Sequence, residues 1–316
     1  MRLECPTIEL WLWGLFFYGG DLMNEKEFDI LGITRWHEAG IKGQGITIAS
    51  RESDRTAHGK CVFELIKQVV PEANIKLKCD YNKDNDFDVY TTSLFFASDK
   101  TKEKRSQQLI DKNKILICAA GNEGDETQTP LSRLEQWLSI GAVHLVDNKI
   151  EIPKYSSSFD GLDFMSFSNV SVPSKVNKIK GTSFSAPLFA SMCALAQSYF
   201  LEKTGKKLTY EQLLQFVKVN CVDICEKGYD IRSGYGLFVL PEPDLIDISK
   251  YINAVKKEGE AMIIYKTLND IPTWGKPTIE KLLNKKAIQG DENGDLNISD
   301  DLLRTLVIHD RLKLYD

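Results

Sequence analysis

The segment that most constrains this chain is Gly181-Thr182-Ser183-Phe184-Ser185-Ala186-Pro187, in which a glycine precedes small and apolar residues. Ser183 stands where a turn is expected to lead into a helix, with small neighbours that leave its hydroxyl accessible. Pro187 is expected in the first helical turn, where a missing backbone N–H loses no hydrogen bond. The residues from Leu188 to Ala196 are apolar on nearly every face. This pattern predicts a helix buried in a sizeable domain.

This segment resembles the nucleophile motif of the subtilase family of serine proteases. The resemblance implies that Ser183 attacks a peptide carbonyl and forms an acyl-enzyme, which water then hydrolyses. A lone serine at a helix start is more often a simple cap. The interpretation therefore needs the other elements of the family.

A nucleophilic serine needs a general base. The chain has four histidines, which are His37, His58, His144 and His309. His58 begins a segment from Val62 to Val70 in which apolar residues recur at helical spacing, and Gly59 follows it directly. This arrangement resembles the His-Gly-x-x-Val element of subtilases, which implies that His58 is the base.

The acid of the triad is where the chain departs from the family, because an aspartate normally ends the preceding strand. Here the apolar positions from Ile46 to Ala49 place Glu52 at the acid position, and Asp54 stands two residues further on. Either carboxylate could hold the imidazole in one tautomer and stabilise the imidazolium. We expect Glu52 to be the acid, with Asp54 as the alternative. A third possibility is that both are solvated loop carboxylates and that the triad is incomplete.

An apolar run, Ile115–Ala120, ends in a turn that contains Gly121 and Asn122. The position of this turn between His58 and Ser183 matches the oxyanion-hole asparagine of subtilases. The resemblance implies that the Asn122 amide and the backbone N–H of Ser183 stabilise the charge that develops on the carbonyl oxygen. The order of acid, histidine, asparagine and serine is also that of subtilisin.

The resemblance extends over roughly residues 43–240 and implies contacts with substrate. The segment Asp88–Leu94 resembles the strand that flanks the substrate, so Ser93 and Leu94 are expected to contact the substrate. Gly121, next to Asn122, is expected to contact the substrate as well. Phe95 replaces the glycine of the family pattern, so the family's substrate preference does not transfer. The expected partner is a protein or peptide substrate, and no cofactor or metal is expected.

Composition and patterning indicate one sizeable domain. The chain has 316 residues, of which 42% are hydrophobic, and its net charge of −5 argues against a nucleic-acid-binding surface. Strand patterns alternate with helical patterns from residue 46 to 220. We therefore predict an α/β fold with a mostly parallel, subtilisin-like sheet flanked by helices, and a small helical C-terminal appendage. The reactive residues then follow the carboxyl ends of strands.

The cysteines and the N-terminus favour the cytoplasm. Seven cysteines without a CxxC pair are expected to be reduced thiols. Residues 1–22 are expected to be a non-native or disordered leader, with the true start at Met23, and their apolar run is too short to span a membrane. We expect no signal peptide and no contact with a membrane.

The sequence pattern changes after Leu240, where the alternation of strands and helices gives way to helical patterns alone. We therefore expect a peptidase domain at 23–244 and a helical C-terminal region at 245–316. Helices are predicted near 246–257, around 279–283 and through 302–307. The region resembles one S-layer-homology-like repeat and the tails of phage cell-wall lysins, which implies contact with a cell wall or phage protein. Residues 291–295 superficially imitate a calcium loop, but Leu302 stands where a bidentate glutamate is needed, so a plain turn is predicted.

Taken together, these patterns predict a cytoplasmic subtilisin-like serine endopeptidase of prophage origin. One alternative is a pseudoprotease that binds proteins without cleaving them, which the altered acid motif and Phe95 favour. Another is a wall- or assembly-binding protein in which the C-terminal region dominates.

Overall fold

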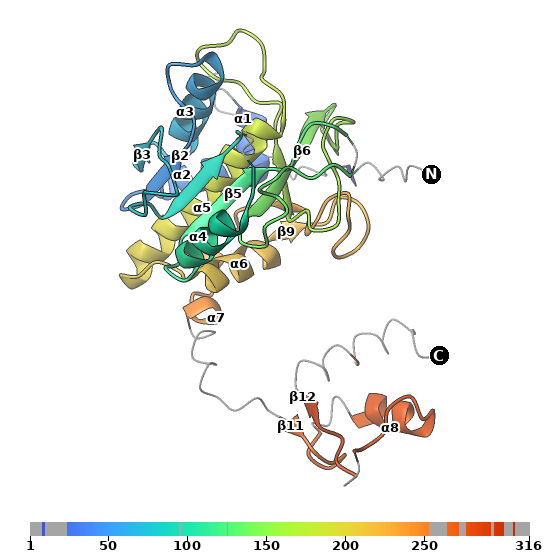
Figure 1. The fold of residues 1–316 in the computed structure, drawn as a ribbon. Helices are drawn as coiled ribbons and strands as arrows, with labels where there is room; N and C mark the ends of the chain where they lie inside the picture. Colours follow the sequence, from blue (N-terminus) through green and yellow to red (C-terminus); the bar gives the residue numbers. More distant parts are fainter. Residues whose placement is uncertain are drawn as a thin grey trace. The chain divides into compact units, whose positions relative to one another are not determined.

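The computed structural model describes residues 8–9, 24–94, 97–124, 126–252, 264–271, 276–291, 294–299 and 306. Two compact units divide the chain, one ending at Ile252 and the other covering residues 253–316, and each is described by itself. Figure 1 shows the elements of both units.

The first unit is built on one large sheet with the order β3-β2-β4-β5-β6-β8-β10-β9. Its strands are β2 (Thr47–Ser50), β3 (Asn74–Lys76), β4 (Val89–Thr92), β5 (Ile115–Ala119), β6 (Leu138–Val146), β8 (Phe164–Phe167), β9 (Cys221–Val222) and β10 (Leu237–Phe238). Neighbours from β3 to β10 pair in parallel, and only the edge strand β9 runs antiparallel to its neighbour in this path. The far end of β6 also pairs antiparallel with β7 (Lys149–Glu151), which pairs with β1 (Ile8–Glu9). The predicted mostly parallel sheet is confirmed.

Helices cover both faces of this sheet. They are α1 (Glu25–Leu31), α2 (Ile33–Glu38), α3 (Ala57–Val69), α4 (Lys100–Ile110), α5 (Thr182–Thr204) and α6 (Tyr210–Val219). Val89 and Ile117 share a core cluster with residues of α3, α5 and α6. Their strand neighbours Tyr90 and Leu116 share a second cluster with residues of α4. This alternation along parallel strands explains why the strands are apolar on both sides.

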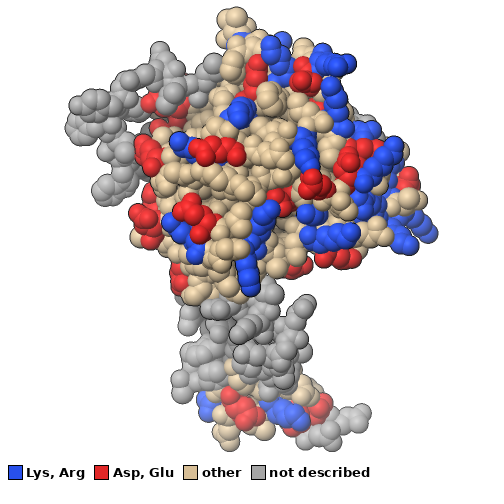
Figure 2. Space-filling model, turned by 90° about the vertical axis from the view of Figure 1, so that its left-hand side faces the viewer, with Lys and Arg blue, Asp and Glu red and all other residues tan. Residues whose placement is uncertain are grey.

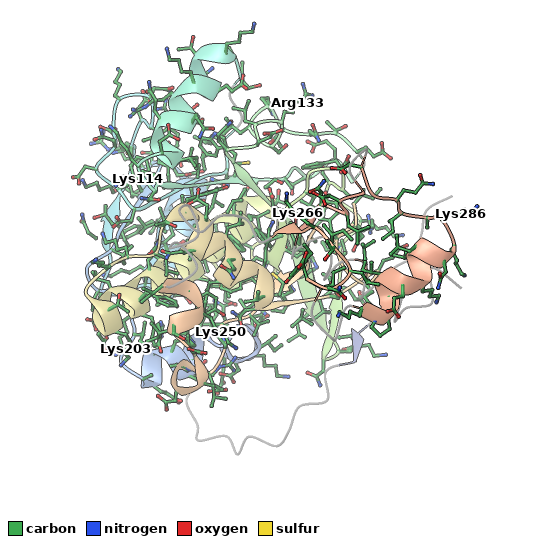
Figure 3. The ribbon with its side chains drawn as sticks, turned by 90° about the horizontal axis from the view of Figure 1, so that it is seen from below. Lys114, Arg133, Lys203, Lys250, Lys266 and Lys286 are labelled. Atoms are coloured by element: carbon green, nitrogen blue, oxygen red, sulfur yellow. The ribbon has the colours of Figure 1, made fainter. Side chains whose placement is uncertain are left out.

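The helix α5 is the central helix of the domain, and it contacts β2, β4, β5, β6 and β8. Among the described residues it is the one helix long and apolar enough to cross a membrane. Almost all of it is buried inside the domain, so its apolar surface is explained by packing in the core. Its last turn carries Lys203, labelled in Figure 3, where a positive charge complements the helix dipole.

The predicted position of Pro187 is wrong. Helix α5 begins at Thr182, so Pro187 lies inside the helix, in its second turn. The motif alone does not tell how many residues separate the serine from the first helical residue. An interior proline removes the N–H that would bond to the carbonyl of Ser183, four residues earlier.

The charged surface of the protein is mixed. On the face shown in Figure 2, acidic and basic side chains are interspersed. Several charged side chains of the protein form ion pairs, such as Lys207 with Asp88 at 2.7 Å and Arg51 with Asp80 at 2.9 Å.

The second unit has a small core of its own, formed by Tyr265, Ile271, Ile279, Leu282 and Ile298. Helix α8 (Lys276–Asn284) matches the helix expected around 279–283, but β11 (Ile264–Tyr265) and β12 (Ile298–Ser299) form an antiparallel pair that we did not expect. Lys266 and Lys286, labelled in Figure 3, belong to this unit. The helix expected at 302–307 lies outside the described residues except for Leu306, which is helical.

Two further sequence predictions, a helix near 246–257 and a turn at 291–295, can be compared with the structure. Of the helix expected near 246–257, only α7 (Ser249–Ile252) is present; residues 246–248 are not helical, a short 3-10 turn η1 (Pro243–Leu245) precedes them, and residues 253–257 lie outside the described residues. At 291–295, the Asp291 carboxylate accepts hydrogen bonds from the Asp295 N–H at 3.0 Å and the Asn297 amide at 2.7 Å. These bonds close a turn, as the sequence indicates.

The expectation that all seven cysteines are reduced is wrong for Cys225, which is disulfide-bonded. Five other cysteines, Cys61, Cys79, Cys118, Cys193 and Cys221, are free. Scattered spacing in the sequence carries no information on which sulfurs meet in the fold, so this bond could not be anticipated.

Candidate active site

The predicted site residues gather around the carboxyl ends of three neighbouring strands. Glu52 follows β2, Ser93 follows β4 and Asn122 follows β5, and these strands are adjacent in the sheet. Ser183 lies in the first turn of α5, which packs against all three strands. Strand ends that point in the same direction bring these side chains to one edge of the sheet.

Glu52 and Asp54 have very different surroundings. The Glu52 side chain is buried, with the residue only 2% exposed, and its carboxylate accepts hydrogen bonds from the Ser93 N–H at 2.6 Å and from the Ser50 hydroxyl. Asp54 is exposed and forms an ion pair with Lys78 at 3.3 Å. A buried carboxylate is stable only when polar partners compensate for lost water, and Glu52 has two of them.

His58 is placed by the start of α3. The Thr56 side chain caps this helix by accepting the Gly59 N–H at 3.0 Å. A Cβ at position 59 would collide with the carbonyl oxygen of Ser53, so only glycine lets the helix start approach the loop after Glu52. The half-buried imidazole packs beside Phe184, with ring centroids 5.3 Å apart.

The three expected triad residues are near one another but are not linked. Within the described part of the chain, His58 forms no hydrogen bond or ion pair with Glu52 or Ser183. The Glu52 carboxylate has further lone pairs beyond those used by Ser50 and Ser93, so it can still accept an imidazole N–H. Catalytic hydrogen bonds often tighten only when substrate binds.

Ser183 is held through its backbone. Its carbonyl accepts the Ser93 hydroxyl at 2.7 Å, while its own side chain is partly exposed. Gly181, two residues earlier, has φ 120° and ψ 149°, a conformation that side chains other than hydrogen rarely permit. The turn before α5 therefore depends on this glycine.

The Asn122 amide is fixed on the oxygen side. Its Oδ1 accepts hydrogen bonds from the Thr182 N–H at 2.9 Å and the Thr182 hydroxyl at 3.1 Å. The side chain is exposed, and its Nδ2 donates no hydrogen bond to the described residues. Its N–H groups are thus presented beside the start of α5, where they can bind an oxygen atom that carries negative charge.

A small cavity of about 10 Å³ lies between the ends of β4 and β5, with room for one water molecule. Its walls are Thr92, Ser93, Leu94, Cys118, Ala119, Thr129, Pro130 and Leu131. Ser93 and Leu94, two of the three expected substrate contacts, line it, whereas Gly121 does not. Phe95, which we expected near the substrate, lies outside the described residues.

Sequence reasoning missed two residues that organise this site. Thr182 supplies both donors that fix Asn122, and Ser50 donates to Glu52. Thr182 lies inside the nucleophile motif, so its presence there was a usable signal. Ser50 precedes Glu52 by two residues on an extended segment, which could also have suggested a contact.

Comparison with known proteins agrees with this architecture. Residues 64–236 match the model of the subtilase family of peptidases, a range that includes Asn122 and Ser183 but begins after Glu52 and His58. The chain is 29% identical over 174 residues to the major intracellular serine protease of Bacillus subtilis (strain 168). That alignment covers 52% of this chain and 53% of the relative, so the chain spans about half the length of the curated relative it matches.

Solved structures share the fold at low identity. A lanthipeptide protease has a TM-score of 0.56 at 15% identity, with 68% of this chain and 96% of that chain covered. The prenylagaramide maturation protease PagA has a TM-score of 0.55 at 18% identity, covering 66% and 95%. A psychrophilic subtilisin-like protease, Apa1 from Pseudoalteromonas sp. AS-11, has a TM-score of 0.54 at 12% identity, covering 67% and 95%. Because the family match covers more than half of the sequence and the fold is shared, the chain belongs to the subtilase family.

Proposed function

We propose that this protein is a serine endopeptidase that hydrolyses protein or peptide substrates through an acyl-enzyme. In this mechanism His58 takes the proton of the Ser183 hydroxyl as the oxygen attacks the peptide carbonyl, and then gives it to the leaving amine. Glu52 accepts the other imidazole N–H and stabilises the imidazolium. A second round, with water in place of the leaving group, releases the acyl product and restores the hydroxyl.

The anchored amide of Asn122 is the observation that carries this proposal. Thr182 occupies its oxygen, so the two Nδ2 hydrogens are left for a negatively charged oxygen formed next to Ser183. Together with the Ser183 N–H they would stabilise the tetrahedral intermediate.

A fluorophosphonate probe tests the proposal directly, because it reacts with an activated serine. We expect wild-type protein to be labelled at Ser183, and we expect Ser183→Ala to lose both the label and cleavage of an unfolded protein substrate. Ser174→Ala, at an exposed serine outside the site, is the matched control and should behave as wild type. Absence of label in folded wild-type protein would refute the proposal.

The second candidate function is that of a pseudoprotease that binds proteins without cleaving them. The lack of a hydrogen bond from His58 to Glu52 or Ser183 among the described residues favours it. It predicts no adduct at Ser183 but measurable binding of peptides. The same labelling experiment therefore separates the two functions.

For residues 245–316 we propose contact with a cell wall or phage protein, in line with the resemblance of that segment to lysin tails. Sedimentation of the full-length Ser183→Ala variant with purified peptidoglycan tests the first of these.

For location we propose the cytoplasm, since the characterised relative is by name an intracellular protease. The Cys225 disulfide weighs against this location, because disulfides persist mainly in oxidising compartments.

A further inference from the structure

Three polar side chains form a closed hydrogen-bonded triangle behind the nucleophile turn. His144 lies in β6, Tyr155 follows β7, and Ser168 follows β8. The His144 Nε2 is 2.8 Å from the Tyr155 hydroxyl and 3.1 Å from the Ser168 hydroxyl, and the two hydroxyls are 2.6 Å apart. Three separate segments of chain thus converge on one phenol oxygen.

The triangle is joined to the turn that leads into α5. The backbone N–H of Gly181 donates to the Tyr155 hydroxyl oxygen at 3.1 Å. The next N–H, that of Thr182, donates to Asn122 at 2.9 Å. The two peptide groups that carry the N–H of Gly181 and of Thr182 are therefore fixed at two separate points, one of which is the Tyr155 oxygen.

The hydrogen bonds within the triangle follow from which of its groups carry protons. The Tyr155 oxygen accepts from Gly181, so its single proton goes to either Ser168 or His144. Burial, with a smaller contribution from Lys180 and Lys178, lowers the pKa of His144, which favours the neutral ring that can accept a hydrogen bond.

The surroundings of the triangle argue against an independent catalytic role. Ser168 is completely buried, so no substrate can reach its hydroxyl. Glu151 lies opposite His144 in the register of β6 and β7, and Lys178 forms an ion pair with Glu27. What remains for the triangle is to hold Gly181, whose N–H is buried and would otherwise lack this acceptor.

We propose that Tyr155 is a positioning residue for the Ser183 nucleophile, acting through the Gly181 backbone and itself oriented by His144 and Ser168. This inference rests on the proposed peptidase function. A displacement of about 1 Å at a reacting atom can lower the rate by about 100-fold. A fixed Gly181 therefore matters more for the rate of attack than for binding of the substrate.

The test compares Tyr155→Phe, which removes only the hydroxyl, with Tyr199→Phe. The Tyr199 hydroxyl is likewise bonded to the backbone, although as a donor, to the Pro243 carbonyl at 2.9 Å, and Tyr199 lies sixteen residues along α5 from Ser183. We expect Tyr155→Phe to lower kcat and the rate of fluorophosphonate labelling by roughly 10- to 100-fold, with KM changed less than about 2-fold. Tyr199→Phe should leave both rates unchanged.

The outcomes separate this inference from the proposed function. Labelled wild type with an equally fast Tyr155→Phe overturns the positioning role alone, whereas unlabelled wild type overturns the function and the positioning role with it. A rise in KM at constant kcat would also overturn it. If Tyr155→Phe does not fold, Ser168→Ala serves instead, since it keeps the Tyr155 oxygen but removes one of its partners. We expect that variant to slow labelling by roughly 3- to 10-fold, and an unchanged rate overturns the proposal.

Discussion

The Ser93 hydroxyl donates to the backbone carbonyl of Ser183 at 2.7 Å, at the position that an ordinary helix would fill with the N–H of residue 187. Pro187 has no N–H, so the carbonyl is released from the helix ladder and Ser93 takes it up. The backbone N–H of Ser93 also donates to Glu52. Ser93 thus connects the buried carboxylate with the helix that carries Ser183, and its hydroxyl is already engaged in the absence of substrate.

We predict that Ser93→Ala lowers kcat by roughly 10-fold, because the Ser183 carbonyl loses its partner and the start of α5 is less well fixed. The free energy of unfolding should fall by about 1 kcal/mol, the cost of a partly buried carbonyl left unpaired. Urea unfolding and peptide cleavage measure the two effects. Ser174→Ala is the matched control, and a Ser93→Ala enzyme with unaltered kcat would contradict the prediction.

A second prediction distinguishes the two carboxylates. Glu52→Gln keeps an oxygen that can accept the Ser93 N–H but removes the charge that stabilises the imidazolium, so kcat should fall by about 10²- to 10⁴-fold. Asp54→Asn breaks only an exposed ion pair with Lys78 and should change kcat less than about 2-fold. Steady-state cleavage of one peptide by both variants is sufficient. The reverse ranking would make Asp54 the acid.

A third prediction concerns the order of effects around the oxyanion. Asn122→Ala should lower kcat by about 10²- to 10³-fold, since it removes a fixed donor. Thr182→Val removes one of the two bonds to the Asn122 oxygen, together with the contact of the hydroxyl with the Gly121 backbone, but keeps the backbone donor, so a loss of only a few-fold is expected. Steady-state kinetics of each variant gives kcat and KM separately, so an effect on catalytic rate can be distinguished from an effect on substrate binding. Equal losses in the two variants would mean that Asn122 acts mainly through the fold.

Much of the architecture could be predicted because it depends on local patterns. Along the chain, short apolar runs such as those of β4 and β5 alternate with segments whose apolar residues have helical spacing. This order of strands and helices predicted the mostly parallel sheet. The glycine and small residues around Ser183, with the apolar run that follows, likewise predicted a turn into a buried helix from residues that are close in the sequence. Features set by a few neighbouring residues are readable without the fold.

The contacts that orient the site could not be predicted, because they depend on distant segments and on side-chain rotamers. Glu52 bonds to Ser93, 41 residues away, and Gly181 bonds to Tyr155, 26 residues away. No spacing rule relates such positions. The two-residue strands β11 and β12 are too short to show a period of two, so the antiparallel pair in the second unit was also invisible.

A fourth prediction concerns Cys225. Protein denatured without reductant should remain unmodified by a maleimide at Cys225 while Cys221, only four residues earlier and free, is fully modified. Peptide mass spectrometry identifies each site. Performed on acid-quenched cells, the same measurement reports the compartment, since a protein kept in a reducing cytoplasm would show both cysteines modified.

The last prediction concerns Asp163, a half-buried residue that lies outside the proposed chemistry. Burial raises its pKa to about 6, against hydrogen bonds from the Ser139 N–H and hydroxyl that lower it. Since the pKa is higher in the folded than in the unfolded protein, the folded state binds more protons between about pH 4 and 6, and stability falls as the pH rises through this window.

Asp163→Asn removes the charge and keeps an oxygen acceptor for Ser139. Its free energy of unfolding should therefore exceed that of wild type by about 1–3 kcal/mol at pH 8, and the difference should shrink towards zero as the pH falls to about 4. Urea unfolding at pH 4.5, 6 and 8 follows the trend, at values chosen to bracket roughly that window. Asp160→Asn, at an exposed neighbour, is expected to shift stability by less than about 0.5 kcal/mol throughout. A pH-independent difference between Asp163→Asn and wild type would show that the hydrogen bonds from Ser139, and not the charge, decide the stability at this position.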